Sequence, residues 1–86
     1  MAQERTIVIE NPNGLHARPA SMFVKLANKS TSKVTVIKDG ESVDGRSIMG
    51  LLSLGLEFKS SIVLKVDGAD EARVIEALTE VLTGNH

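Results

Sequence analysis

Residues 33–44, KVTVIKDGESVD, combine a strand pattern with a hairpin signal. KVTVIK (33–38) is rich in β-branched residues and predicts a strand. Asp39-Gly40 is a strong signal for a two-residue hairpin turn, so residues 41–44 are expected to form a short antiparallel partner strand. The middle of the chain is therefore predicted to be a β-hairpin, and the other elements are expected to assemble around it.

The stretches on either side of the hairpin predict two further strands and three helices. Alternating apolar residues indicate strands, and apolar residues at helical spacing indicate helices. Ser47 and Asp70 are the residues expected to cap the second and third helices. The order βαββαβα predicts an α+β fold in one domain over 1–86, with helices covering one face of a mainly antiparallel sheet. The flanking elements are a strand at 5–10, helices at 17–29 and 47–55, a strand at 61–66 and a helix at 71–82.

The composition excludes several kinds of site. The 86 residues include no cysteine, so a disulfide framework, a thiolate nucleophile and cysteine-ligated zinc are impossible. With two phenylalanines and no tryptophan or tyrosine, the chain lacks the rings on which nucleic-acid bases stack. It also has no apolar run near ~18 residues and no secretion signal at its start. We expect a cytoplasmic protein with no membrane insertion, no nucleic-acid partner and no cofactor.

Charge is distributed unevenly along the chain, although the formal net charge is only −1. Two interpretations fit the stretch between Glu10 and Asp39. Its basic residues form an ordinary solvated surface, or they create a positive field around His16 that attracts an acidic or phosphorylated partner. This stretch has no acidic residue and contains Arg18, Lys25, Lys29, Lys33 and Lys38.

His16 is the candidate reactive residue. It follows the turn NPNG (11–14) and precedes the first helix, because Pro19 is tolerated in a first helical turn and disfavours helical geometry at Arg18. A helix N-terminus offers unpaired N–H groups and a positive dipole end, which together bind phosphate. The same field disfavours the imidazolium and leaves a neutral nucleophile. Arg18 adds a guanidinium suited to phosphate oxygens.

Other roles for this histidine stay open at the level of the residues. A histidine before a helix is commonly a surface residue or a cap. A metal site is disfavoured, because the second histidine is His86 near the end of the chain and no cysteine assists. A serine hydrolase using Ser21 or Ser47 would need a carboxylate and an oxyanion hole, which no local spacing provides. We therefore expect no metal site and no hydrolase.

Two motifs, NPNGLHARPA (11–20) and RSIMGLLSLGL (46–56), resemble those of HPr, the histidine-containing phosphocarrier family of the phosphoenolpyruvate-dependent sugar phosphotransferase system. The resemblance extends over nearly the whole chain. It implies an open-faced β-sandwich in which three helices cover one face of a four-stranded antiparallel sheet. It also implies a phosphocarrier rather than an enzyme, and we expect the protein to be a monomer.

Carried over by position, the resemblance implies a role for each residue of the first motif. Enzyme I, using phosphoenolpyruvate, would phosphorylate His16 on Nδ1, and the phosphoryl group would pass to the IIA domain of a sugar permease. Arg18 would steady the phosphate and balance its charge. The partners would dock on an exposed patch formed by Leu15, Ala17, Ser21, Met22, Lys25, Ile48, Met49 and Leu52.

Ser47 has two interpretations. As a helix N-cap it needs no regulatory role. However, SIMG (47–50) resembles the form of the family in which an HPr kinase/phosphorylase modifies this serine. A phosphate on Ser47 would leave the helix intact, because the positive end of the helix dipole favours a negative charge at this position. It would hinder transfer at His16 and create a surface for a catabolite-control repressor.

Two stretches depart from the family pattern. EFKSS (57–61) lacks the glycine that many members have before the fourth strand, and VDGRS (43–47) lacks the usual Asn and Lys before the serine. Two alternatives also stay open. One is an HPr paralogue that serves a nitrogen-related or regulatory phosphorelay. The other is a non-catalytic α+β ligand-binding module that makes no use of His16.

Overall fold

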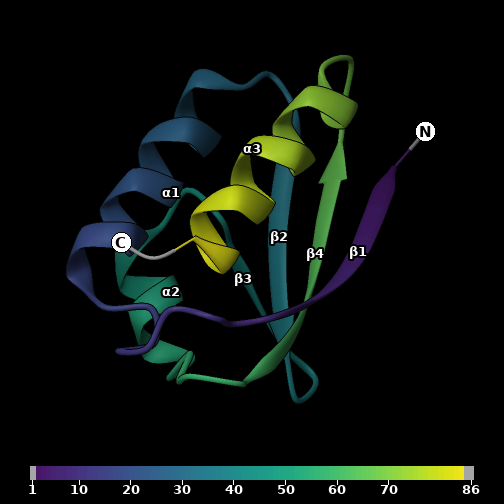
Figure 1. The fold of residues 1–86 in the computed structure, drawn as a ribbon. Helices are drawn as coiled ribbons and strands as arrows, with labels where there is room; N and C mark the ends of the chain where they lie inside the picture. The colour runs from purple at the N-terminus through teal and green to yellow at the C-terminus, as the bar shows by residue number, and fades with distance from the viewer. Residues whose placement is uncertain (1, 85–86) are drawn as a thin grey trace.

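The computed structural model describes residues 2–84 and arranges them as a sheet whose one face is covered by helices (Figure 1). The sheet has the strand order β1-β4-β2-β3, and every neighbouring pair is antiparallel. The predicted α+β fold with the order βαββαβα is confirmed. The elements are β1 (Gln3–Val8), α1 (Ala17–Lys29), β2 (Lys33–Lys38), β3 (Glu41–Asp44), α2 (Ile48–Ser53), β4 (Ser61–Asp67) and α3 (Glu71–Thr83).

The central hairpin has the predicted geometry. Lys38 of β2 lies opposite Glu41 of β3 in the antiparallel register. Between them Asp39 has φ 51° and Gly40 has φ 83°. A type I′ turn requires positive φ at both central residues, which is why an Asp-Gly pair favours it. The bounds of β2, β3 and α1 agree with those predicted from the sequence.

The first strand is displaced by two residues from the predicted 5–10, because it begins at Gln3 and ends at Val8. Beyond β1 the chain turns from the sheet toward the end of α3. The Glu10 N–H donates to the Leu82 carbonyl at 3.4 Å, and Nδ2 of Asn11 donates to the Val81 carbonyl at 3.4 Å. These contacts carry the chain across the molecule to the start of α1 (Figure 1).

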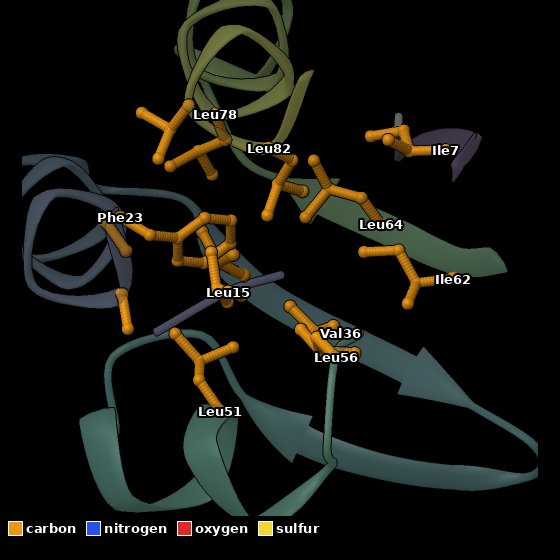
Figure 2. Packing of buried hydrophobic residues seen from close by; sticks show 14 of the residues in the cluster. Ile7, Leu15, Phe23, Val36, Leu51, Leu56, Ile62, Leu64, Leu78 and Leu82 are labelled. Carbon is orange, nitrogen blue, oxygen red and sulfur yellow. The ribbon is translucent and has the colours of Figure 1, made fainter. Parts of the chain in front are cut away.

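The core lies between the sheet and the helices, and it is aliphatic apart from one ring (Figure 2). Phe23 points from α1 into this cluster and is fully buried, whereas Phe58 is half-exposed on a loop. In β4 the buried residues alternate with more exposed ones, which is the pattern of a strand with one covered face. Other buried members are Ile7, Leu15, Val36, Leu51, Leu56, Ile62, Leu64, Leu78 and Leu82.

The second helix is shorter than the predicted 47–55. The Ser47 hydroxyl caps it as expected, because Oγ accepts a hydrogen bond from the Gly50 N–H at 3.0 Å. The helix ends at Ser53, and Gly55 then adopts φ 64°. This left-handed conformation favours glycine and directs the chain away from the helix.

Asp70 occupies the N-cap position of α3, but its carboxylate does not cap that helix, so this detail of the prediction is wrong. The carboxylate turns instead to the loop after α1. There it accepts hydrogen bonds from the hydroxyls of Ser32 and Ser30, the latter at 3.0 Å, and from the Thr31 N–H at 3.3 Å. The bond from Ser32 lowers the pKa of Asp70 most, against an opposing effect of burial, and Ser30 and Thr31 lower it further, from 3.8 to about 2.

Replacing Asp70 with asparagine is expected to lower the free energy of unfolding at neutral pH and to change how that free energy depends on pH in acid. Because the folded state holds this carboxylate ionised, its contribution is complete above the unfolded pKa of 3.8 and is lost as pH falls toward about 2. The stability gap between the wild type and Asp70→Asn should therefore narrow over that interval. Urea unfolding at a series of pH values measures the gap, and a gap that stays constant would contradict the assignment.

Candidate functional site

His16 lies at the N-cap of α1, as the position of Pro19 predicts. Its backbone is extended, with φ −90° and ψ −172°, and its carbonyl accepts the first helical hydrogen bond, from the Ala20 N–H at 3.1 Å. Its side chain does not cap the helix and is half-buried. The imidazole is therefore not committed to holding the helix and can serve another role.

The first turn of α1 is suited to an anion. Helix geometry leaves the N–H groups of Ala17 and Arg18 without acceptors inside the helix, and Pro19 has no N–H to offer. No acidic side chain lies in this turn. The Arg18 side chain is exposed beside it. A phosphate next to His16 would meet backbone N–H groups, a positive dipole end and a guanidinium.

The turn before His16 rests on the segment that follows α2. The Leu15 N–H donates to the Leu56 carbonyl at 2.7 Å, and the Gly14 N–H closes a turn on the Asn11 carbonyl at 2.9 Å. Gly14 has φ 69°, and a Cβ at this position would lie 2.7 Å from the Leu56 oxygen. Only glycine fits this approach without a shift of the backbone. No local sequence signal indicates the Leu15–Leu56 contact, because it joins distant segments.

Leu15 does not belong to the exposed patch that the resemblance implies for it, so this prediction is wrong. Its side chain is only 6% exposed and is part of the core cluster (Figure 2). The reason is the hydrogen bond to Leu56, which draws the residue over the sheet instead of leaving it on the helix surface. Leu15 precedes α1, so the helical periodicity gave no information on its direction.

The other residues of the predicted patch lie on two helices that pack against each other. Met49 is 74% exposed, Leu52 39% and Met22 36%, so these apolar side chains are available at the surface. Ala17 and Lys25 are also exposed, whereas Ser21 and Ile48 are half-buried. We call the following set the docking face: Ala17, Ser21, Met22, Lys25, Ile48, Met49 and Leu52.

Ser47 lies at the opposite end of α2 from the segment that supports the His16 turn. The six residues of α2 place about 9 Å of helix between these ends. Ser47 is half-buried and directly precedes Ile48 and Met49 of the docking face. The structure therefore puts it beside the docking face, with the helix separating it from the turn that carries His16.

Arg46, one of the positions that depart from the family pattern, points away from the adjacent serine. Its Nη2 donates to the carbonyls of Ser30 and Ser32 at 3.1 and 3.0 Å. Its own N–H donates to Oδ1 of Asp44 at 2.9 Å. Arg46 thus joins the start of α2 to the loop after α1, a contact between distant segments that the sequence pattern did not reveal.

The described residues hold neither a candidate membrane span nor a candidate metal centre. No helix within residues 2–84 is long and apolar enough to cross a bilayer. In the same range, no three or more His, Cys, Asp or Glu side chains are grouped so as to hold a metal ion. His86, considered above as the second histidine, lies outside the described residues.

Known proteins are similar to this chain in sequence and in fold. The model of the family described as "PTS HPr component phosphorylation site" matches residues 3–84. HPr-like protein Crh of Halalkalibacterium halodurans is 44% identical over 75 residues, which cover 87% of this chain and 89% of that protein. Phosphocarrier protein HPr of Buchnera aphidicola subsp. Acyrthosiphon pisum is 41% identical over 80 residues, covering 93% and 94%.

A solved structure is also similar to this chain in both sequence and fold. The crystal structure of HPr-C-His from Thermoanaerobacter tengcongensis is 41% identical and superposes with a TM-score of 0.90, covering 98% of each chain. The family match, the sequence identity and the shared fold thus extend over almost all of the described residues. The chain therefore belongs to the HPr family, whose members are phosphocarriers of the phosphotransferase system and not catalytic enzymes.

Proposed function

We propose that this chain carries a phosphoryl group on His16. It accepts the group from enzyme I, which draws it from phosphoenolpyruvate, and donates it to IIA domains of sugar permeases. The observation that carries the proposal is the place of His16 at the N-terminus of α1, in the same turn as the N–H groups of Ala17 and Arg18. There the half-buried imidazole makes no capping hydrogen bond.

The chemistry requires only that the chain hold and release the group. On loading, the lone pair of Nδ1 of His16 attacks phosphorus as the bond from phosphorus to the donor breaks. On unloading, the new phosphorus–nitrogen bond breaks as an acceptor nucleophile attacks. Each partner supplies the in-line alignment, while the helix N-terminus and Arg18 stabilise the negative charge of the phosphate.

The docking face suits several partners. Met22 and Met49 are flexible and polarisable, so they adapt to different apolar surfaces. Lys25, together with Arg18, supplies positive charge on α1 and favours partners with acidic rims. The chain is proposed to act as a cytoplasmic monomer.

Loading and unloading can be followed in one experiment. The protein is incubated with phosphoenolpyruvate and purified enzyme I, and its intact mass is measured before and after a IIA domain is added. The expected result is a gain of one phosphoryl group, which then disappears. An unchanged mass after incubation with enzyme I would contradict the proposal. A group that stays on the chain after addition of several IIA domains would limit the role to regulation.

A regulatory role at Ser47 is a second candidate. We propose that an HPr kinase/phosphorylase modifies this residue and that the modified surface binds a catabolite-control repressor. The position of Ser47 beside Ile48 and Met49 supports this, as does the similarity to HPr-like protein Crh. A regulatory or nitrogen-branch paralogue remains compatible with the same site. Membership of a phosphocarrier family gives no support to a non-catalytic ligand-binding module.

Replacing Ser47 with aspartate is expected to slow the loading of His16 by about threefold to tenfold, because charge added beside a docking surface mainly lowers the association rate. Aspartate still caps α2, so the unfolding midpoint should be retained. Ser47→Asn is the matched control, since asparagine caps equally well without the charge. Initial rates with limiting enzyme I measure the effect, and equal rates for the two variants would exclude the inhibitory role.

A further inference from the structure

Lys38, the last residue of β2, reaches to the end of α2. Its ammonium donates hydrogen bonds to the carbonyl of Leu54 at 3.3 Å and to that of Gly55 at 2.8 Å. The side chain is half-buried. A cation at this place satisfies the carbonyls of the C-cap residue Leu54 and of the residue that follows it, and it lies at the negative end of the helix dipole. Lys38 thus fixes the chain where it leaves α2.

The residue after Gly55 supports the turn that carries His16. The Leu56 carbonyl accepts the Leu15 N–H at 2.7 Å, and Gly14 lies against the same oxygen. The carbonyls bound by Lys38 and the carbonyl that holds Leu15 are therefore consecutive along the chain. A shift of segment 54–56 would move the support of the His16 backbone by a similar amount.

We propose that Lys38 is a positioning residue for phosphoryl transfer. It holds segment 54–56 in the place that orients His16. The proposal rests on the role of His16 proposed above. Lys38 does not touch the reacting atoms; it acts through Leu56 and Leu15. Its effect is accordingly expected on the rate of transfer within the complex and not on the affinity for partners.

The test uses three variants of the full chain. Lys38→Met keeps the length of the side chain and removes its donors, and Lys38→Arg restores a cationic donor. The control is Arg5→Met. Arg5 also joins a strand to a helix, with Nη2 2.6 Å from Oε1 of Glu76 and Nη1 3.1 Å from Oγ1 of Thr79, but it belongs to neither the His16 turn nor the docking face.

Single-turnover transfer from phosphorylated enzyme I is measured at saturating concentration, and affinity for enzyme I is measured separately. Since a misplacement near 1 Å can cost about 100-fold, a loosened support should slow transfer in Lys38→Met by about threefold to tenfold. Affinity should stay within about twofold of the wild type. Lys38→Arg should recover most of the rate, and Arg5→Met should transfer at the wild-type rate.

Three results would overturn the proposal while leaving the role of His16 intact: a wild-type rate in Lys38→Met, a loss confined to affinity, or an equal slowing in Arg5→Met. Failure of the wild-type chain to be loaded would contradict the proposed function itself. Hydrogen exchange of the Leu15 amide then decides the positioning role independently. Exchange should be faster in Lys38→Met than in Arg5→Met, and equal exchange would refute the proposal.

Discussion

Alanine in place of His16 is expected to abolish loading of the chain by enzyme I and phosphoenolpyruvate, to the limit of detection. Alanine has no nitrogen that could form the bond to phosphorus. The variant should nevertheless fold, because the His16 side chain makes no capping hydrogen bond and is only half-buried. We expect its free energy of unfolding to differ from that of the wild type by less than about 1 kcal/mol. Loss of loading would therefore report on chemistry and not on folding.

The matched control for this variant is His86→Ala, which removes the only other histidine of the chain. It should be loaded at the wild-type rate. Both variants are followed by intact mass after incubation with the same enzyme I, and folding is checked by thermal unfolding. Loading of His16→Ala at a rate near that of the wild type would disprove the assignment of His16 as the acceptor.

Alanine in place of Phe23 is expected to cause the largest loss of stability among these variants. The ring is fully buried, and it is the only aromatic side chain of the core cluster. It also approaches the backbone that leads from β3 to α2, since a Cβ on Gly45 would lie 3.1 Å from its Cε1. Removing a buried phenylalanine typically costs about 3–5 kcal/mol, a large part of the roughly 5–15 kcal/mol that stabilises a domain.

Urea unfolding measures this loss, and Met22→Ala provides the comparison from the same helix. Met22 is 36% exposed, so its removal should cost less than about 1 kcal/mol while weakening the affinity for enzyme I. Phe23→Ala should thus mainly lower stability, whereas Met22→Ala should mainly lower the affinity for enzyme I. A loss below about 1 kcal/mol in Phe23→Ala would show that the core does not depend on this ring.

Local patterns in the sequence were sufficient for the elements whose geometry is set by neighbouring residues. Asp39-Gly40 predicts the hairpin because its positive φ angles are a property of that pair. Pro19 places the start of α1, and with it His16, because proline constrains the residues next to it. Ser47 is the cap of α2 for a similar local reason. The position of the proposed phosphoryl acceptor could therefore be predicted before the fold was known.

The contacts that complete the site join segments far apart in the sequence, and no local pattern reports them. The burial of Leu15 depends on the Leu56 carbonyl, and the support of that segment depends on Lys38. Aspartate is a common helix cap, yet the Asp70 carboxylate accepts hydrogen bonds from the hydroxyls of the loop after α1. Tertiary packing determines these contacts. It outweighs the local preference of a residue when hydrogen-bond donors from a distant segment lie within reach.

One departure from the family pattern has a direct physical explanation. Within EFKSS (57–61), Lys59 adopts φ 71°, a conformation that favours glycine. The loop is held there by hydrogen bonds from the Lys59 N–H to the Ile9 carbonyl at 2.8 Å and from the Ser60 N–H to the Glu57 carbonyl at 2.9 Å. This conformation costs about 1–2 kcal/mol at a non-glycine residue. The hydrogen bond to Ile9, in the segment that leads to His16, helps to offset that cost.

Locating the phosphoryl group on the wild-type chain is the most direct test that this protein is a carrier acting through His16. The protein is loaded with enzyme I and phosphoenolpyruvate, and the modified atom is identified by phosphorus–proton correlation NMR, with stability to acid measured in parallel. We predict a single acid-labile phosphoryl group on Nδ1 of His16. An acid-stable group on Ser47, a group on any other residue, or no group at all would contradict that assignment.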